Sequence, residues 1–487
     1  MSKLASIRKE YAIIDAVAKW QESLWYPALF AVLCAIAGSG NCYVYAPVFW
    51  IYCALVVFSA LFADDLKVFI PPVFFFYCSL GSDLSPEQLL DREASFDSFS
   101  TAGLVNFIAA GVIMVIAFVA RLAASGAFKR FFKVRGGIFY SMIAMSAALM
   151  LNGIFSGSAS LKNLVYGAAI GLGLLLLYML FSAIFADSRD CAPYVCASAL
   201  GVSLAATAQV FFRAITVYKA DLLFTYDELG GVIGINRDIL QLSWGVATIV
   251  GAVIVLGVPA AFYLARKARY SLIYYAAAIV LLIGSAVIDT RSAIITGAVF
   301  FIFCAIFCCF SGENKRKNRI YTLVIILASV GALSAWHVYK GDVMELWLGL
   351  SKFLRFDIMS ENLRFRYWQD GMADFLRAPV FGVGFDDGVV IEGVSYTFSN
   401  PFSGMYHSII FQFLAAAGIV GFIAFLYHCV EYARLLFTRR SADKLLILLL
   451  PAMIIVMSLV DNFFFYFNFQ IFYAAFFALA ERESREK

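Results

Sequence analysis

Charged side chains are scarce in this sequence. Asp, Glu, Lys and Arg together make up 14% of its 487 residues, whereas hydrophobic residues make up 63%. A soluble protein carries about 25% charged residues, so this composition argues against a soluble globular domain. Apolar stretches of about 18 residues or more recur along the chain, which is the pattern of transmembrane helices. The sequence therefore predicts an all-α, polytopic membrane protein.

Metal-binding patterns and a cleavable leader are also missing. The three histidines are scattered, and the ten cysteines have no metal-ligand spacing and lie mostly in apolar runs, where they act as small hydrophobic residues. We therefore expect no metal and no cofactor. The start of the chain, 1–24, lacks the pattern of a signal peptide and is a charged amphipathic segment, which we expect to lie in the cytoplasm on the membrane surface.

Fourteen apolar segments are candidates for membrane-spanning helices. Several are shorter than the roughly 20 residues that a perpendicular span needs, so we expect about 12–14 spans in one integral membrane domain over 1–487. The segments are 25–39, 44–62, 66–80, 101–123, 138–156, 164–186, 193–217, 239–265, 271–288, 291–311, 320–339, 407–435, 445–460 and 463–480.

Basic residues gather in four short segments between these spans, at 129–135, 266–269, 315–319 and 439–444. The positive-inside rule places all four in the cytoplasm, and alternating spans from a cytoplasmic N-terminus return each of them there. Both termini are then cytoplasmic, and the polar segment 340–406 becomes a large, partly helical extracytoplasmic loop. We interpret the clusters as determinants of topology rather than as nucleic-acid sites.

Ionisable groups are rare in the middle of the predicted spans. Ion-coupled transporters need such groups near the membrane midplane, and no internal repeat supports a transporter. The unusual charges lie instead at the extracytoplasmic ends of the spans, a distribution that suits an anionic head group or a phosphate. They are Arg213, Lys219, Arg237, Asp289, Arg291, Arg364, Arg366 and His407.

Arg291 and His407 each begin an apolar run at the predicted outer boundary. Arg291 lies near a helix N-terminus, whose dipole favours anions, and its guanidinium can donate two hydrogen bonds to a phosphate. The alternative is an arginine that reaches the phosphates of membrane lipids. The imidazole of His407 can accept a proton from a hydroxyl nucleophile. The alternative is a structural interface histidine, as we expect for His337 and His428.

The predicted loop contains a helix at 362–377. On this helix Arg364 and Trp368 share one face through their i,i+4 spacing, while Arg366 pairs with Asp370 on another face. These spacings place one arginine and one tryptophan on the same side of the loop helix.

Acidic residues in and after the loop have open interpretations. We interpret the pair Asp386 and Asp387 as a solvated turn rather than a metal or sugar-nucleotide site. Asp461 lies between two predicted spans as a turn or helix-cap residue, and a role as an acid catalyst stays open.

Taken together, these residues resemble the O-antigen ligase and O-antigen polymerase superfamily. In that family an outer-face arginine hairpin, an R-x-x-x-W helix in a periplasmic loop, a P-x-x-G-x-G turn and a histidine that opens the next span follow in this order. Here they read T-R-S at 290–292, R-F-R-Y-W at 364–368, P-V-F-G-V-G at 379–384, and H-S with G-I-V-G at 407–408 and 418–421. S-L-V-D at 458–461 is similar to the family's Asp before the final span, and Asn236 to a family Asn. The resemblance covers about residues 230–480, and Ser408 departs from it because the family often has Asn there.

The resemblance implies a GT-C-like membrane glycosyltransferase that uses a polyprenyl-diphosphate-linked oligosaccharide and no metal. Arg291 and Arg364, or Arg366, would hold the diphosphate, and His407 would be the general base of an inverting transfer. Further candidate substrate-binding residues are Arg213, Arg237 and Asn236.

The resemblance also implies a location and partners. The protein would lie in the bacterial cytoplasmic (inner) membrane among its lipids, with the site on the extracytoplasmic face. A polysaccharide chain-length regulator is a candidate partner, and nucleic acid is not.

Several functions fit this pattern. We favour a surface-polysaccharide polymerase, because the chain departs from the ligase pattern beside His407. An O-antigen ligase that joins polymer to lipid A-core would use the same machinery, as would a protein O-glycosyltransferase of the same superfamily. A polysaccharide exporter or flippase is the alternative from another class.

Overall fold

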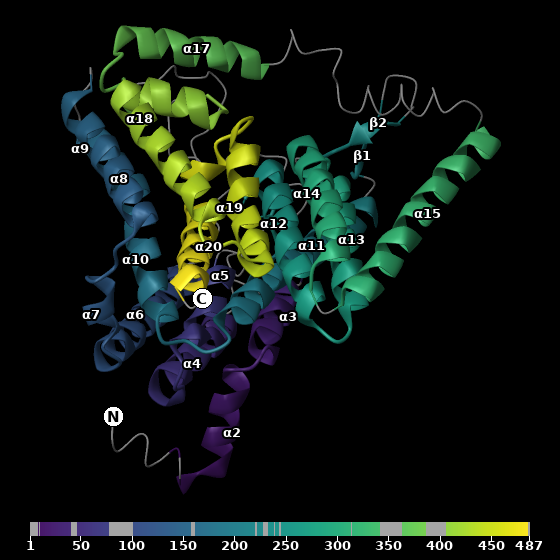
Figure 1. The fold of residues 1–487 in the computed structure, drawn as a ribbon, viewed down its shortest axis with the longest axis horizontal. Coiled ribbons are helices and arrows are strands. Elements are labelled where there is room, and N and C mark those ends of the chain that lie inside the picture. The colour runs from purple at the N-terminus through teal and green to yellow at the C-terminus, as the bar shows by residue number, and fades with distance from the viewer. Residues whose placement is uncertain are drawn as a thin grey trace.

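The computed structural model describes most of the chain as a bundle of long helices. The helix α17 lies across one end of the bundle, and α15 leans away from it (Figure 1). The residues described are 8, 10–39, 46–76, 101–156, 161–219, 222–226, 232–237, 239–242, 245–312, 314–340, 363–385 and 406–485.

The first half of the chain is helical wherever it is described, apart from its turns. Its elements are α2 (Ala12–Gln21), α3 (Trp25–Ser39), α4 (Ala46–Phe62), the 3-10 turn η2 (Leu66–Phe69), α5 (Ile70–Phe75), α6 (Thr101–Ala124), α7 (Ala127–Phe131), α8 (Gly137–Phe155), α9 (Leu161–Gly167), the π-helical turn η4 (Ala168–Leu172), α10 (Gly173–Phe185) and α11 (Cys191–Lys219).

The second half contains a short antiparallel hairpin, formed by β1 (Phe224–Tyr226) and β2 (Val232–Ile235). The helices that follow it are α12 (Ala247–Lys267), α13 (Ser271–Val287), α14 (Arg291–Phe310), α15 (Lys315–Lys340), α17 (Leu363–Arg377), α18 (Ile409–Phe437), α19 (Ala442–Ser458), the 3-10 turn η6 (Phe463–Phe465) and α20 (Phe467–Arg485).

The protein is an all-α polytopic membrane protein, as the sequence predicts, apart from the small hairpin. Each predicted span coincides with a helix or with consecutive helical pieces. The largest difference is at 239–265, where α12 starts only at Ala247 because a β-bridge between Leu242 and Gly245 precedes it. Among the described residues, six helical segments have the length and composition to cross a membrane: Gly137–Phe155, Leu161–Phe185, Cys191–Lys219, Ala247–Lys267, Arg291–Phe310 and Ile409–Phe437.

The centre of the bundle is α12, whose most apolar window is 94% buried. It packs against α11, α13, α14 and α19. Two glycines allow this close approach: a Cβ at Gly251 would lie 2.7 Å from the Thr290 side chain, and one at Gly257 would lie 2.7 Å from Ser203. Helices in membranes associate through such small residues, because lipid provides no hydrophobic drive for association.

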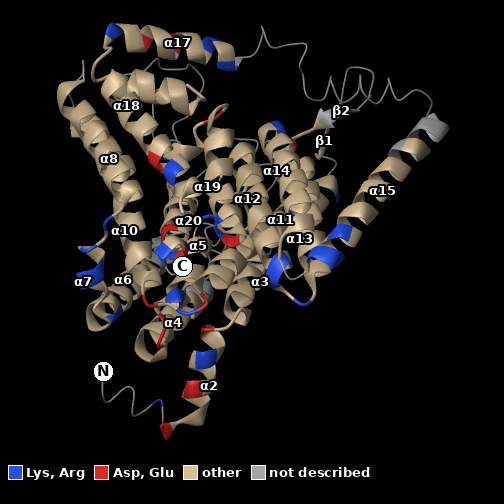
Figure 2. Ribbon diagram, viewed as in Figure 1, with Lys and Arg blue, Asp and Glu red and all other residues tan. Residues whose placement is uncertain are grey.

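The basic clusters lie together at one end of the bundle (Figure 2). Two contacts join clusters directly: Lys267 Nζ with Asp443 Oδ2 at 3.1 Å, and Lys317 Nζ with the carbonyl of Arg269 at 3.5 Å. The end of α20 connects a further pair of clusters, because Arg485 Nη2 donates to the carbonyl of Arg135 at 2.8 Å and Arg439 Nη1 donates to the carbonyl of Ser484 at 2.8 Å. Helix α17 and the first turn of α14 lie at the opposite end (Figure 1).

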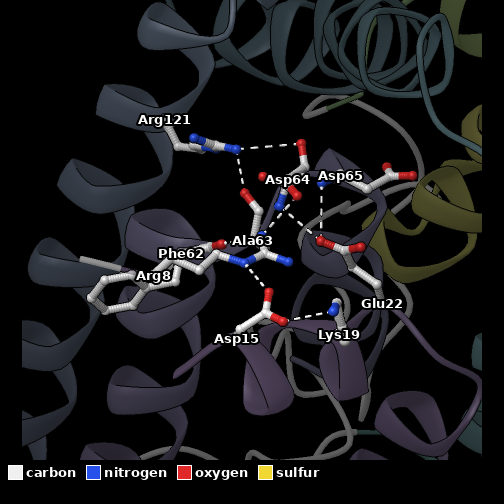
Figure 3. A network of polar contacts seen from close by, with 9 residues as sticks. All are labelled: Arg8, Asp15, Lys19, Glu22, Phe62, Ala63, Asp64, Asp65 and Arg121. Atoms are coloured by element: carbon white, nitrogen blue, oxygen red, sulfur yellow. Dashed lines mark hydrogen bonds and ion pairs between the residues drawn. The ribbon is translucent and has the colours of Figure 1, made fainter. Parts of the chain in front are cut away.

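A polar network at the basic end ties the N-terminal segment to the bundle (Figure 3). Arg8 donates from Nε to Asp15 Oδ1 at 2.9 Å and pairs through Nη1 with Asp64 Oδ2 at 2.8 Å. Glu22 Oε1 accepts from the backbone N–H of Asp64 at 2.8 Å, and Arg121 of α6 donates to the carbonyl of Asp64 at 3.3 Å. One side of α2 is therefore fixed to the turn that follows α4.

Helix α18 is interrupted near the opposite end of the bundle. Gly418 has φ +62° and ψ −162°, a conformation that is essentially limited to glycine. The turn 379–384 fits into this break: the N–H of Ile419 donates to the carbonyl of Pro379 at 2.9 Å, and the N–H of Val383 donates to the carbonyl of Ala415 at 2.8 Å. The P-x-x-G-x-G turn and the G-x-x-G of α18 are thus two halves of one backbone junction.

This junction predicts a specific effect of adding one methyl group. A Cβ at Gly418 would lie 2.3 Å from the carbonyl oxygen of Val380. We expect Gly418→Ala to lower stability by at least about 1–3 kcal/mol, the usual cost of such a backbone conformation in a non-glycine residue. The measurement is the thermal unfolding midpoint of the detergent-solubilised protein.

The matched control is Gly173→Ala. Gly173 is helical, and a Cβ there would meet no atom within 4 Å, so alanine should be neutral or slightly stabilising. Equal unfolding midpoints for the two variants would contradict the assignment of the junction.

Candidate active site at the end of the bundle

Helix α17 is docked on the start of α18. The indole of Trp368 stacks on Phe411 with ring centroids 5.5 Å apart, and its Nε1 donates to the carbonyl of His407 at 3.4 Å. Gly371 permits this approach, because a Cβ there would lie 3.0 Å from the ring of Tyr406. The helix face that the sequence assigns to Arg364 and Trp368 is therefore the one that meets α18.

A buried hydrogen bond fastens the same two elements. Tyr406 donates from its hydroxyl to Asp374 Oδ2 at 2.7 Å, and both side chains are buried. Arg377 pairs with the other carboxylate oxygen, Oδ1, at 3.5 Å. Burial, together with the hydrogen bond to Asp374, raises the pKa of Tyr406 well above its usual value. The hydroxyl therefore keeps its proton and acts as a donor at neutral pH.

We call the hydrogen bond between Tyr406 and Asp374 the latch. His407 connects the latch to α18 and has an unusual backbone conformation. Its φ is +48°, in the left-handed region that residues other than glycine rarely adopt. Strained residues of this kind persist only where the surrounding structure holds them, and they are common at active sites. In this structure Tyr406 and Trp368 hold the main chain on both sides of the histidine.

The side chain of His407 forms a cluster with Asp461 and Arg364. Its Nδ1 lies 3.1 Å from Asp461 Oδ1, and Arg364 Nη2 lies 3.6 Å from Asp461 Oδ2. Asp461 lies in the turn between α19 and η6, is 3% exposed, and also accepts from the N–H of Asn462 at 2.9 Å. Three residues that are far apart in the sequence thus meet at one carboxylate.

The charges around Asp461 keep this buried carboxylate ionised. Burial by itself would raise the pKa of Asp461, but the hydrogen bond and charge of His407, the charge of Arg364 and the N–H of Asn462 together lower it below its usual value. Asp461 is therefore negatively charged at neutral pH. A buried carboxylate with these partners can orient an imidazole and stabilise a positive charge on it.

This pairing fixes which nitrogen of His407 can accept a proton. An ionised carboxylate only accepts hydrogen bonds, so in the neutral form of the ring Nδ1 carries the hydrogen and Nε2 carries the lone pair. The ring of Tyr367 stacks on the imidazole with centroids 5.3 Å apart, which restricts its rotation. The side chain of His407 is 30% exposed, so the imidazole is in contact with solvent.

Most of the other predicted site residues lie on other elements. Arg291 is the first residue of α14, at the α17 end of the bundle, and α14 packs against α19, which leads to Asp461. Arg366 is exposed on α17. Arg213, near the end of α11, donates from Nε to the carbonyl of Ile239 at 3.3 Å. The turn after β2 holds Asn236 and Arg237.

The structure thus brings Arg364 and His407 together at Asp461. Arg366 instead lies on an exposed face of α17. Among the described residues, no ion pair joins Arg366 to Asp370, so that predicted pair is not formed. His428 has the structural position expected for it, since it is buried in α18 between Ser141 Oγ at 2.8 Å and the Tyr473 hydroxyl at 2.7 Å.

Other predictions for this region cannot be compared with the structure. Asp386, Asp387 and most of the loop 340–406 lie outside the described residues. Within the described part of the chain, no group of three His, Cys, Asp or Glu side chains is arranged to hold a metal ion.

Sequence reasoning missed two functional candidates and left a third open. For Asp461 it did not choose between a helix-cap residue and an acid catalyst, although the position of this residue just before the last predicted span pointed to a functional role. It did not find Asp374. This residue follows Trp368 and Gly371 at helical spacing, so the sequence could have placed it on the same face of the predicted helix. Gln412 gave no signal, because a single glutamine in an apolar helix has no pattern.

A comparison with protein families finds a match within the second half of the chain. Residues 276–426 match the family described as O-Antigen ligase. This match supports membership of the chain in the O-antigen ligase and polymerase superfamily. The resemblance seen in the sequence is therefore confirmed, and it supports a membrane protein of ligase or polymerase type. The match covers about a third of the chain and includes Arg291, Arg364 and His407. A comparison with curated proteins finds no match.

The latch between Tyr406 and Asp374 can be tested without an activity assay. Tyr406→Phe removes a donor and leaves a carboxylate buried with one fewer partner, which costs about 1–3 kcal/mol. We expect backbone amides of α17 to exchange hydrogen about tenfold faster or more in this variant, because helix docking opens more often. Hydrogen exchange followed by mass spectrometry measures this.

The control is Tyr427→Phe. Tyr427 is an exposed tyrosine of α18, on the opposite side of the Gly418 break from Tyr406. Unchanged exchange of α17 in both variants would show that the latch does not hold the helix.

Proposed function

We propose that this protein is a membrane glycosyltransferase that transfers a polyprenyl-diphosphate-linked oligosaccharide to an acceptor hydroxyl. The proposal places the reaction at the outer face of the bacterial cytoplasmic membrane. The observation that carries it is the His407 imidazole, held by Asp461 next to the Arg364 guanidinium. A base, an orienting carboxylate and a fixed cation in one partly exposed cluster are the parts that this transfer needs.

The charge distribution supports the orientation. The basic clusters lie at one end of the bundle, and the positive-inside rule assigns that end to the cytoplasm. The His407 cluster is at the other end and so faces outward, and both termini are cytoplasmic. Soluble nucleotide sugars are cytoplasmic donors, so a donor carried by membrane lipid fits an outward site better.

The transfer is a displacement at the anomeric carbon. The acceptor oxygen attacks from the face opposite to the diphosphate, while His407 Nε2 takes the hydroxyl proton. The new bond between the acceptor oxygen and the anomeric carbon forms as the bond to the diphosphate breaks, and the configuration inverts. The electron pair of the broken bond leaves with the lipid diphosphate. Asp461 stabilises the imidazolium that results.

Guanidinium groups stabilise the leaving diphosphate in this scheme. Arg364 has five N–H donors in a planar fork, and its Nη2 lies 3.6 Å from Asp461 Oδ2. In the proposed reaction this guanidinium also donates to phosphate oxygens of the leaving group. Arg291 begins α14 where no side chain caps the helix, so its guanidinium and the helix dipole act in the same direction. These fixed positive charges serve where many glycosyltransferases use a divalent metal ion.

The remaining predicted residues belong to substrate binding. We assign Arg366, Arg213, Arg237 and Asn236 to contacts with the glycan or the diphosphate.

We propose a polymerase, for which the acceptor is a second lipid-linked repeat unit. Ser408 replaces the asparagine that often follows the histidine in the family, and it is buried at the start of α18. A ligase is the second candidate, because the matched family is described as O-Antigen ligase. The two differ in acceptor, and a chain-length regulator would be a partner only of a polymerase.

The mechanism predicts the effects of two substitutions in a deletion strain of the native host. His407→Ala removes the base and should reduce transfer by about 10²–10⁴-fold. Asp461→Asn keeps the size of the side chain but loses the charge that orients the imidazole, and we expect a loss of at least about 10²-fold. Gel profiles of surface glycan measure transfer, and immunoblots of membranes measure the amount of protein.

The control is Arg269→Ala, which removes an exposed arginine of a basic cluster, outside the proposed site. It should leave the glycan profile intact. Normal long-chain glycan from His407→Ala at normal protein level would refute the mechanism.

The same profiles identify the acceptor. For a polymerase, the inactive variants leave one repeat unit on its normal anchor, whereas for a ligase they leave free polymer and a bare anchor. Lipid-linked units that stay on the cytoplasmic face would instead indicate an exporter and contradict the proposed activity.

A further inference from the structure

A buried amide lies beside the cluster and touches both the backbone before His407 and the turn that carries Asp461. Gln412 is in the first turn of α18 and is 1% exposed. Its Oε1 accepts two hydrogen bonds, from the N–H of Tyr406 at 3.2 Å and from Nδ2 of Asn462 at 2.9 Å. A single carbonyl oxygen with two lone pairs therefore joins the loop end to the α19–α20 turn.

The second residue of this bridge continues to the carboxylate. The backbone N–H of Asn462 donates to Asp461 Oδ1 at 2.9 Å, and the same oxygen lies 3.1 Å from His407 Nδ1. Since Tyr406 is bonded directly to His407, these contacts close a ring. The ring runs from the imidazole through Asp461, Asn462 and Gln412 back to the main chain of the histidine.

This ring explains how the strained backbone at His407 is held. The N–H of Tyr406 lies before the start of α18, where no carbonyl of that helix accepts it, and Gln412 Oε1 accepts it instead. The backbone N–H of Gln412 also donates to the carbonyl of Ser408 at 2.8 Å. The residues on both sides of His407 are thus hydrogen-bonded to Gln412. Residues in strained conformations need such support from the surrounding structure.

We infer that Gln412 and Asn462 are positioning residues that set the direction of the His407 imidazole. This inference rests on the proposed function, because it assumes that His407 is the base. Gln412 fixes the main chain of the histidine, and Asn462 fixes the carboxylate that orients its ring. Neither residue touches substrate, so both act on the rate of transfer and not on the binding of donor or acceptor.

The decisive comparison is between Gln412→Met and Gln412→Glu. Methionine has nearly the same length but no strong acceptor, so it releases Tyr406 and Asn462 together. Glutamate keeps an oxygen that can accept both bonds. The assay uses the full-length protein in liposomes, with lipid-linked oligosaccharide extracted from the deletion strain as the titrated substrate.

We expect Gln412→Met to lower kcat by about 10²-fold, as a small misplacement of a reacting group does, with KM changed by less than about twofold. Gln412→Glu should recover at least about tenfold of that loss. Asn462→Ala, which keeps its backbone N–H, should lower kcat by about tenfold. It serves as the second test if Gln412→Met does not fold, as judged by thermal unfolding.

The matched control is Gln209→Met. Gln209 is also 1% exposed and donates from Nε2 to the carbonyl of Cys34 at 2.8 Å, in a different part of the bundle. We expect it to keep wild-type kcat and KM. A role in stability alone would predict that Gln412→Met and Gln209→Met behave alike, and that the glutamate variant does no better than methionine.

His407→Ala in the same assay separates the two levels of the proposal. If His407→Ala retains turnover, the proposed base is wrong. If His407→Ala is inactive while folded Gln412→Met and Asn462→Ala have wild-type kcat, or raise KM alone, only the positioning inference is overturned.

Discussion

The α17 end of the bundle depends on one buried carboxylate. Asp461 is almost inaccessible to solvent, and an isolated charge in such a place would be strongly disfavoured. It is stable there because His407, Arg364 and the N–H of Asn462 surround it. Each partner comes from a different segment of the chain. The buried charge of Asp461 is therefore stabilised only when α17, the residues that precede α18 and the α19–α20 turn come together. The contacts that allow Asp461 to be buried in the fold are therefore the same contacts that form the candidate site.

The rest of the bundle supplies a rigid base for this assembly. The turn 379–384 fills the break in α18 at Gly418, and this fixes the exit of α17 relative to the helix that starts after His407. Asn152 of α8 donates to the carbonyl of Phe381 at 2.7 Å, and Asn163 of α9 accepts from the N–H of Phe385 at 2.8 Å. Polar side chains of the first half of the protein thus secure the turn of the second half.

Much of the fold could be predicted from sequence because hydropathy is a local property. The predicted spans agree with the helices, since each apolar run contains enough information to determine its own helix. The positions where prediction differed are those where backbone hydrogen bonds and not hydropathy decide, as at the bridge before α12.

The site was only partly predictable. The helical spacing of Arg364 and Trp368 assigned them correctly to one face, because that relation is local. The choice between Arg364 and Arg366, and the role of Asp461, depend on which chain segments meet across the end of the bundle. Gln412 belongs to the same class: its role arises from a partner 50 residues further along the chain. Such pairings follow from tertiary packing and leave no periodic signal in a single sequence.

The most direct test of the account is a structure of the full-length protein in lipid nanodiscs with a polyprenyl-diphosphate-linked oligosaccharide bound. The account predicts that the diphosphate contacts Arg364 and Arg291, and that the acceptor side of the anomeric carbon faces His407 Nε2. A diphosphate bound at the basic end of the bundle, or bound with His407 turned away from the sugar, would contradict it.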